Sequence, residues 1–575
     1  MKKMSLLLSM LLCAVFLLSA CGPDAAGNTP EEPTAVEDSA AAADTAVEEE
    51  APAVEEPASE EAPPQEASAA DSKVGGSLVW VVNAEPDTLD PHKTHSAVSD
   101  AVMSLLGTSL VAMNPDGEII PYVAESWNTS EDGLVWDFTL RQDVTFHDGT
   151  PLTAHDFAWT YQRAVDPETA SPAAASMLGS MTSAEAIDDY TLRLTLSEAY
   201  YPFLLTLASS GYLQPLPQGA LEEMGEEVFA RAPVGTGPYT LKEWLTGERV
   251  VLERNPDYAW GPEIGASGNQ YYIETIEFRV IPEYATQVAG LEAGEIDYMI
   301  VGDRDMGAFR DNPDYQVFKR PLQGISPYMV MNLEAEPFLD LNVRKAFNLA
   351  LDREAMINVI LEGRGVVQYG PISESVIGYW PGVEEIGYGY DPDQAAAYME
   401  EAGYARNDDG MWEKDGEVLY IPLNISAGNE SSARVAQIIQ DQYRRFGVDV
   451  ELVTLDAGIY SETVLGGEFT ACLASWLYTD ADLMYLIFHS SMIGALNVHR
   501  LNDPQIDALL EQTRTETDPV AHQAAVDEAQ KLLVENAIFV PLYTPVENYV
   551  VSARVQDLIF SNQFGLFIND AYITE

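Results

Sequence analysis

Two histidine–aspartate pairs are the residues whose type and spacing best suit metal chemistry. The segment TFHDGTPLTAHDF places His147 before Asp148 and His155 before Asp156. Imidazole nitrogens and carboxylate oxygens are common ligands of zinc and other transition metals. The same residues also suit a structural role, because an Asp-Gly pair favours a turn and Thr153 can cap a following helix. We favour the structural interpretation and expect no bound metal.

No other spacing in the chain indicates covalent catalysis. The sequence lacks a Gly-x-Ser-x-Gly elbow, a His-Glu-x-x-His motif, a Walker loop and a Ser-x-x-Lys pair. The glycine-rich segment GTGPY at 235–239 has neither the lysine nor the third glycine of a phosphate loop, and it predicts a tight turn. We therefore expect a protein that is not an enzyme and that needs no cofactor.

The first residues predict a secretory signal. Two lysines precede an apolar run at 6–18, which is short for a membrane-spanning helix, and two small residues follow it before Cys21. The ending Leu-Ser-Ala-Cys resembles the bacterial lipobox, which implies a signal peptide over 1–20 and a lipid on Cys21. Two or more acyl chains make such an anchor stable. The alternative is an ordinary signal in which Cys21 is incidental.

An acidic linker is predicted between the signal and the rest of the chain. Residues 22–73 consist mainly of Ala, Glu, Pro and Ser, without aromatic residues, and carry 15 acidic residues and one lysine. Such a segment cannot bury enough apolar surface to offset its ordering entropy, so we expect disorder over 21–73. A flexible coil of this length reaches roughly 40 Å on average, and charge repulsion extends it further. The predicted arrangement is a folded body on a membrane tether.

The composition of the remaining 502 residues, 74–575, limits the possible classes of protein and of partner. Their length predicts two or three substructures, and 47% apolar and 10% aromatic residues overall suit a packed, water-soluble protein. Cys472 is the single cysteine after the linker, which excludes an internal disulfide or a cysteine-rich metal site. With 77 acidic against 26 basic residues, nucleic acids and anionic membrane surfaces are excluded as electrostatic partners.

Sequence periodicity predicts a mixed α/β protein with more than one lobe. GSLVWVV near the start reads as a strand, and alternating segments between 136 and 199 flank a helix over 153–164, which suggests a small α+β insert. Later, LYIPLNIS, a helix over 431–446 and VDVELVTL form a β-α-β unit typical of a parallel sheet. One further helix is predicted between Asp340 and Gly363, and its apolar face comprises Val343, Phe347, Leu351 and Ile357.

Several segments, in order, resemble the family 5 extracellular solute-binding proteins, the peptide- and nickel-binding receptors of ABC importers. The longest is VAESWNTSEDGLVWDFTLRQDVTFHDGTPLTAHDFAWTYQR at 123–163. The resemblance covers essentially all of 74–575. The other matching segments are PDTLDP (86–91), VGTGPYTLKEW (234–244), LERNPDY (252–258), LEAGEIDYM (291–299), PFLDLNVRKAFNLALDREAMI (337–357) and NDPQIDALL (502–510).

This resemblance implies a fold of the periplasmic-binding-protein type, a two-lobed clamshell of type II (cluster C) with an extra α+β domain. Two segments, near 323–328 and 542–548, would cross between the lobes and act as hinges. The implied division is domain I over 74–112, 234–325 and 543–575, domain II over 113–233, and domain III over 326–542.

The resemblance also implies where a ligand binds. In peptide-binding members a Trp-x-x-Asp segment meets the ligand, and its carboxylate pairs with the α-ammonium of the peptide. Here the segment is ASWLYTDADLMYLIF, in which Trp476 matches but Thr479 occupies the acidic position. Either Asp480 serves after a one-residue contraction, or the Asp-Ala-Asp sequence matches only the downstream Asp-Pro-Asp turn. By this resemblance the side chain of Trp476 faces the ligand. The alternative is that Trp476 packs in the hydrophobic core.

Four further residues are expected to line the ligand site by the same resemblance. They are Tyr478, Asn429 in the loop SAGNESS, and Thr94 and His95 after PDTLDPHK. For His95 a satisfied structural role is the alternative.

The expected function is that of a monomeric, lipid-anchored receptor in the bacterial envelope, with its folded part outside the cytoplasm. It would capture a peptide or similar small solute between two lobes and deliver it to the permease subunits of an ABC transporter. The alternative ligands are an oligosaccharide, an opine-like compound or a metal chelate. A cell-surface hydrolase is a remote alternative, since no nucleophile–base motif is present.

Overall fold

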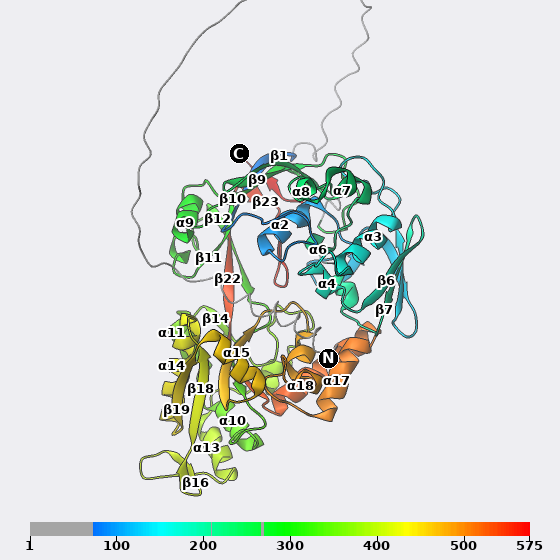
Figure 1. Cartoon of the computed structure of the whole chain (residues 1–575). Helices are drawn as coiled ribbons and strands as arrows, with labels where there is room; N and C mark the ends of the chain where they lie inside the picture. The colour runs from blue at the N-terminus through cyan, green and yellow to red at the C-terminus, as the bar shows by residue number, and fades with distance from the viewer. Residues whose placement is uncertain (1–72, 209, 266–269, 575) are drawn as a thin grey trace, which may run out of the picture. The chain divides into compact units, whose positions relative to one another are not determined.

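A computed structural model describes residues 73–208, 210–265 and 270–574 (Figure 1). The predicted signal peptide, Cys21 and the acidic linker up to residue 72 lie outside these ranges. Within the ranges, no helix combines the length and the apolar character needed to cross a membrane. Strands and helices alternate along the chain in two larger sheets and several small ones, and the mixed α/β class predicted from the sequence is confirmed.

The larger sheet gathers strands from the beginning, middle and end of the described chain. Its order is β12-β22-β11-β1-β10-β9-β8, with β14 beside β22, and β1 lies parallel to β10 and β11. Leu78 of β1 packs in one core with Val102 of α2, and Val79 packs in another with Leu291 of α9, so β1 is buried on both faces. The elements are β1 Gly75–Val82, α2 Ala97–Leu106, β8 Tyr239–Leu245, β9 Arg249–Arg254, β10 Ile273–Val280, α9 Tyr284–Glu292, β11 Tyr298–Val301, β12 Tyr315–Pro321, β14 Gly365–Val367 and β22 Tyr543–Ser552.

The predicted α+β insert is a four-stranded antiparallel sheet, β4-β5-β7-β6, covered by helix α3. Phe157 and Tyr161 of α3 pack on Phe138 and Leu194 of the sheet. Thr153 caps α3 in a reciprocal box with Asp156, as the sequence predicts. The elements are β2 Val111–Met113, β3 Ile119–Pro121, β4 Ala124–Thr129, β5 Val135–Leu140, α3 Ala154–Val165, α4 Ala174–Met177, β6 Met181–Asp188, β7 Thr191–Leu196, α5 Phe203–Thr206, α6 Ser210–Leu213, α7 Gln218–Met224 and α8 Glu226–Phe229.

A five-stranded sheet, β19-β18-β20-β13-β21, forms the second large part of the structure. Alternation along β13 divides its side chains between two cores: Met329 packs with α10, α13 and α14, and Tyr328 packs with α16, α17 and α18. The elements are β13 Ile325–Met331, α10 Leu341–Leu349, α11 Arg353–Ile360, α12 Val383–Ile386, α13 Pro392–Glu401, β18 Tyr420–Ser426, α14 Glu430–Arg445, β19 Asp449–Leu455, α15 Ala457–Gly466, β20 Ala471–Trp476, α16 Leu483–Phe488, α17 Pro504–Thr515, α18 Pro519–Glu535 and β21 Phe539–Pro541.

The predicted β-α-β unit is confirmed, because β18 and β19 are parallel and α14 connects them. The prediction of one helix between Asp340 and Gly363 is wrong. Asp340 caps a helix, but that helix ends at Leu349, and Asp352 starts a second one by accepting from the backbone N–H of Ala355 at 2.8 Å. A side chain that satisfies the free N–H groups of a new first turn favours a restart there.

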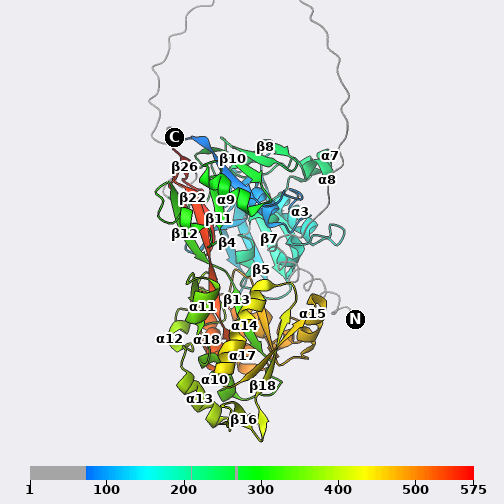
Figure 2. The same ribbon diagram turned by 90° about the vertical axis from the view of Figure 1, so that its left-hand side faces the viewer.

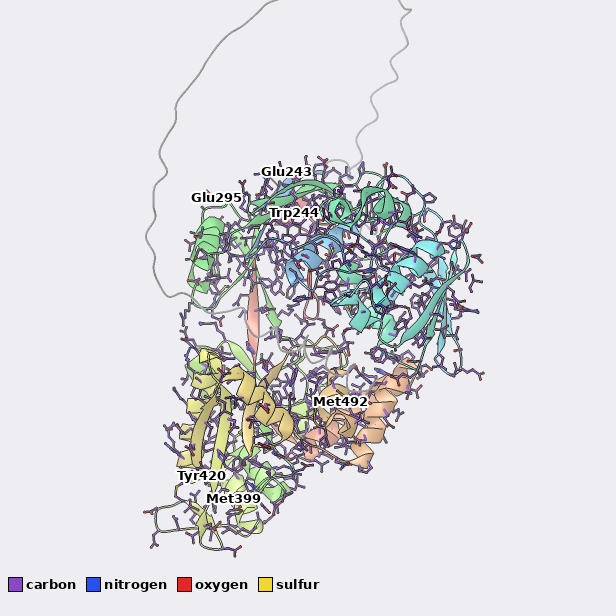
Figure 3. All side chains as sticks on the ribbon, viewed as in Figure 1. Glu243, Trp244, Glu295, Met399, Tyr420 and Met492 are labelled. Atoms are coloured by element: carbon purple, nitrogen blue, oxygen red, sulfur yellow. The ribbon has the colours of Figure 1, made fainter. Side chains whose placement is uncertain are left out.

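Strand β22 connects the two large parts (Figure 2). Its first residues pair with β14, and residues 546–552 pair with β11 or β12. Between β12 and β13, Gly324 has a φ of +93°, and a Cβ there would lie 2.0 Å from the carbonyl oxygen of Trp476. Only glycine fits this crossing. Figure 3 shows Trp244 of β8 near the top of the view and Tyr420 of β18 toward the bottom.

We call the part built on the larger sheet and the insert (74–321 and 546–574) the first lobe, and the part built on the five-stranded sheet (325–543) the second lobe.

Candidate functional site

The end of β20 and the segment that follows it carry three of the predicted ligand-binding residues, Trp476, Tyr478 and Asp480. β20 lies between β18 and β13, parallel to β18, and ends at Trp476. Ligands of α/β sheets characteristically bind beyond the carboxyl ends of such strands. The indole of Trp476 is half-buried, and its Nε1 donates to the hydroxyl of the fully buried Tyr328 at 3.0 Å. That bond fixes the ring, while the rest of the indole packs at the edge of the core formed with α16–α18.

Asp482 and Arg514 form a bidentate ion pair next to this segment. The guanidinium Nε and Nη2 donate to the two carboxylate oxygens at 2.6 and 2.7 Å. The side chain of Asp482 is 2% exposed and that of Arg514 is 21% exposed. The guanidinium carbon also lies 3.6 Å from the ring centroid of Tyr485. The charge of Asp482 is therefore compensated within the protein.

The protein compensates the charge of Asp480 less fully than that of Asp482: the charge of Arg514 lowers the pKa of Asp480, but burial and the charge of Asp482 raise it more. Asp480 accepts a hydrogen bond from the backbone N–H of Asp482 at 2.7 Å, and in the described part of the chain no ion pair joins it to a lysine or an arginine. Burial, followed by the charge of Asp482, raises the pKa of Asp480 to about 7. The cluster of Asp480, Asp482 and Arg514 thus has one negative charge too many when both carboxylates are ionised.

The residues around Asp480 hold it in place and supply further aromatic surface. The N–H of Ile377 donates to the carbonyl oxygen of Thr479 at 3.0 Å, which ties the segment to a neighbouring loop. Tyr478 is half-buried, and burial together with the charges of Asp480 and Asp482 raises the pKa of its phenol well above the usual value. The phenol therefore stays protonated and able to donate.

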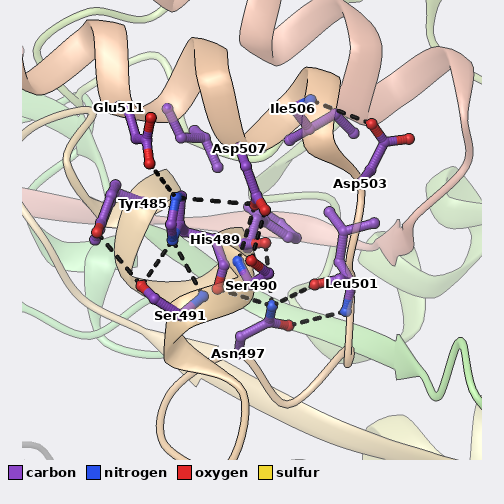
Figure 4. A network of polar contacts seen from close by, with 12 residues as sticks. Tyr485, His489, Ser490, Ser491, Asn497, Leu501, Asp503, Ile506, Asp507 and Glu511 are labelled. Atoms are coloured by element: carbon purple, nitrogen blue, oxygen red, sulfur yellow. Dashed lines mark hydrogen bonds and ion pairs between the residues drawn. The ribbon is translucent and has the colours of Figure 1, made fainter.

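A polar network holds the two helices that present Asp482 and Arg514 (Figure 4). The N–H and the hydroxyl of Ser490, just after α16, donate to Asp507 of α17 at 2.9 and 2.5 Å. The side-chain amide of Asn497 donates to the carbonyl oxygens of Phe488, His489 and Leu501. These bonds fix α16 against α17, so that Asp482, just before α16, meets Arg514 near the end of α17.

The other predicted lining residues have local partners in the structure. Asn429 caps α14 by accepting from the N–H of Ser432 at 2.9 Å. The buried hydroxyl of Thr94 donates to Asp87 at 2.7 Å, and His95 is exposed. Over the described ranges, no hydrogen bond or ion pair connects Asn429, Thr94 or His95 to Trp476 or Asp480. Their contact with a ligand stays a prediction.

The histidine–aspartate pairs have the structural roles that the sequence favours. Asp148 accepts from the N–H of Thr150 at 2.9 Å in the predicted turn. The Nδ1 of His147 accepts from the N–H of Gly235 at 3.2 Å, and burial lowers the pKa of His147. Among the residues that the structure describes, no group of three or more His, Cys, Asp or Glu could hold a metal ion.

Sequence reasoning missed Arg514 and Tyr200. Arg514 lies 32 residues after Asp482 on another helix, and Tyr200 comes from the insert, where its hydroxyl donates to Asp482 at 3.2 Å. Neither residue stands in a motif whose spacing indicates such a contact. The isolated tyrosine pair at 200–201 in a polar turn was the only signal in the sequence.

The two-lobed mixed α/β fold is that of the solute-binding proteins as a class. The family model of bacterial extracellular solute-binding proteins, family 5, matches residues 118–492, and the chain belongs to this family. It is a solute-binding receptor of an ABC importer, and the predicted clamshell fold is confirmed.

Known relatives match over most of the chain. The periplasmic oligopeptide-binding protein OppA of Escherichia coli (strain K12) is 30% identical over 511 residues, which cover 83% of this chain and 88% of OppA. The structure of HbpA2 from Haemophilus parasuis is similar with a TM-score of 0.78 at 25% identity, covering 87% of this chain and 100% of that one. The unliganded open form of the murein tripeptide binding protein MppA has a TM-score of 0.75 at 25% identity, covering 86% and 97%.

Proposed function

We propose that this receptor captures peptides, or similar small solutes, that carry a cationic group. The observation that supports this ligand class is the carboxyl group of Asp480, which has no ion-pair partner among the described residues and lies next to the neutralised pair of Asp482 and Arg514. A desolvated carboxylate gains most from a cationic partner, and a neutral sugar would leave it unpaired. The similarity to OppA, an oligopeptide-binding protein, agrees with this choice.

Trp476 supplies the apolar contact of the proposed site. An indole offers a large, rigid surface that stacks on ligand groups without demanding one particular side chain. Its orientation is set by the bond to Tyr328. Tyr478, Asn429, Thr94 and His95 complete the proposed lining.

The mechanism follows from differential binding and contains no covalent step. A ligand that contacts both lobes binds the closed form more tightly than the open form, so it shifts the population toward closure. The proposed hinges are the crossing segments near 323–328 and 542–548, between domains I and III as the sequence divides them. We further propose that the protein is a monomer, held at the membrane by a lipid on Cys21 and by the linker 21–73.

The ligand class is tested by mass spectrometry of the small molecules released when receptor purified from its native envelope is denatured. Peptides or other amines are expected. A second measurement titrates random tetrapeptides with free amino termini against their N-acetylated forms and against oligosaccharides. Binding of oligosaccharides without binding of peptides would overturn the proposed ligand class, while the role as a receptor would stand.

A further inference from the structure

The turn between β7 and α5 of the insert docks on the second lobe. The backbone N–H of Tyr201 donates to the carbonyl oxygen of Arg514 at 2.6 Å. The ring of Tyr201 stacks on the ring of His522 in α18, with centroids 3.7 Å apart and an interplanar angle of 18°. The hydroxyl of Tyr200 donates to Asp482 at 3.2 Å, and the ring of Tyr200 lies 5.3 Å from the guanidinium carbon of Arg514.

This contact ends on Asp482 and Arg514, which lie next to the proposed ligand site. Asp482 takes the hydroxyl of Tyr200 and the guanidinium of Arg514 with the same carboxylate, and Asp480 stands two residues earlier. Tyr200 is therefore placed to hold Arg514 on Asp482 rather than on Asp480. The insert in this way supplies a positioning residue to a site on the other lobe.

The contact is also separate from the strands that join the lobes. The crossings are β22 and the connection from β12 to β13, reinforced by an ion pair between Arg364 Nε and Asp303 at 3.0 Å. In Figure 1, β22 lies to the left, whereas β7 and α17 lie to the right. One backbone hydrogen bond, one stacked ring pair, one tyrosine–carboxylate bond and one ring–guanidinium contact are few enough to break without unfolding either lobe.

We propose that residues 199–202 form a latch that docks and undocks between the lobes and that steadies the ligand-bound arrangement of Asp482 and Arg514. The coupling of the latch to ligand binding rests on the proposed function. The opening of the latch does not depend on that function, so the two can fail separately.

Hydrogen–deuterium exchange of the full-length protein tests the latch, because the amide hydrogen of Tyr201 forms one of the docking hydrogen bonds. In wild-type protein the amides of 199–205 should exchange through local openings of the latch. During these openings the amides of β18 should remain protected from exchange. Removing the stacked ring with His522→Ala should speed exchange of 199–205 by about three- to tenfold, given the usual strength of an aromatic pair. Tyr200→Phe tests the bond to Asp482 with little change in shape.

The matched control is Tyr390→Ala, which removes a tyrosine that is 55% exposed on the second lobe and should leave exchange of 199–205 unchanged. Random tetrapeptides with free amino termini should slow that exchange in wild-type protein. The latch is refuted if 199–205 exchanges only on global unfolding, or if His522→Ala has no effect there.

Native mass spectrometry separates failure of the latch from failure of the proposed function. Tetrapeptides that bind without slowing exchange of 199–205 would refute the coupling of the latch to the site. Tetrapeptides that do not bind would refute the ligand class, and the comparison of His522→Ala with Tyr390→Ala would then decide the latch alone.

Discussion

Arg514 holds both carboxylate oxygens of Asp482, at 2.6 and 2.7 Å, whereas Asp480 two residues earlier accepts a backbone N–H and has no ion pair among the described residues. Two acids so close in sequence therefore have different environments. Asp482 is a structural partner of α17 and of the insert, and we propose Asp480 as the acid that meets a ligand.

Replacing Arg514 by Ala should destabilise the second lobe. The change leaves the carboxylate of Asp482 buried and unpaired, which costs about 3–5 kcal/mol for fully buried pairs. Because a fifth of the Arg514 side chain is exposed, we expect about 3 kcal/mol, the lower end of that range. Urea unfolding measures it.

The control for this prediction is Arg445→Ala. Arg445 pairs with Asp441 on α14, but its side chain is 76% exposed, so the loss should be below about 1 kcal/mol. Adding Asp482→Asn to Arg514→Ala should restore part of the stability, since no buried charge is then left unpaired. Equal losses for Arg514→Ala and Arg445→Ala would show that the buried pair contributes little.

Replacing Asp480 by Asn should weaken binding of peptides with free amino termini by roughly 2–5 kcal/mol, the range for breaking a buried charge pair. Acetylated peptides should lose much less, because they bring no cation to this carboxylate. Isothermal titration measures both series, with Asp408→Asn, an exposed acid elsewhere on the second lobe, as the control. Equal losses in the two peptide series would make Asp480 a turn residue.

Binding of cationic peptides should weaken as the pH falls below about 7. Burial and the charge of Asp482 raise the pKa of Asp480 to about 7, so at lower pH the ligand must displace a proton. The expected loss approaches tenfold per pH unit in this range. Titration in buffers of different ionisation enthalpy should show proton release for wild-type protein and none for Asp480→Asn.

The raised pKa of Asp480 also affects the stability of the protein without ligand. In the pH range from about 4 to 7 the folded protein keeps the proton on Asp480, whereas an unfolded chain has lost it. Asp480 therefore lowers the free energy of unfolding as the pH rises through this range. Asp480→Asn should remove that slope, and an unchanged slope in urea unfolding across these pH values would contradict the shift.

The sequence predicted those parts of the fold in which local signals and packing agree. Thr153 caps α3 and the β-α-β unit around α14 is parallel, as periodicity and capping residues indicated. The single helix from Asp340 failed because Asp352 also has a capping side chain, and sequence periodicity continues across the break. A capping residue inside an apolar helical pattern thus indicates that one helix ends and another begins there.

The candidate site was predictable only in part. Trp476 and Asp480 follow a strand and stand in one segment, so a local motif could indicate them. Arg514 reaches Asp482 from a different helix, and Tyr200 reaches it from the insert. Such contacts depend on how whole elements pack, which spacing in one sequence does not encode.

Changing Cys21 to Ala should release the protein from membranes. The sequence places Cys21 where the apolar run of the signal ends, and stable anchoring needs the acyl chains that this sulfur would carry. Membrane fractionation and mass spectrometry of the N-terminal peptide measure the result, with Cys13→Ala as the control within the signal. A Cys21→Ala protein that remains membrane-bound and acylated would contradict the anchor.

Deleting residues 22–72 should leave ligand affinity unchanged within about twofold. Their composition predicts a solvated chain that spaces the receptor from the membrane, and a tether acts on reach rather than on a binding site. Isothermal titration of both forms with the same tetrapeptides measures this.

Since the linker carries 15 acidic residues, long-range attraction of cationic peptides is the one route by which it could act, and that attraction is screened at 0.15 M salt. A matched linker in which every acid is replaced by Gln separates charge from length. A loss greater than tenfold on deletion at this salt concentration would mean that the segment contacts the ligand or the folded body.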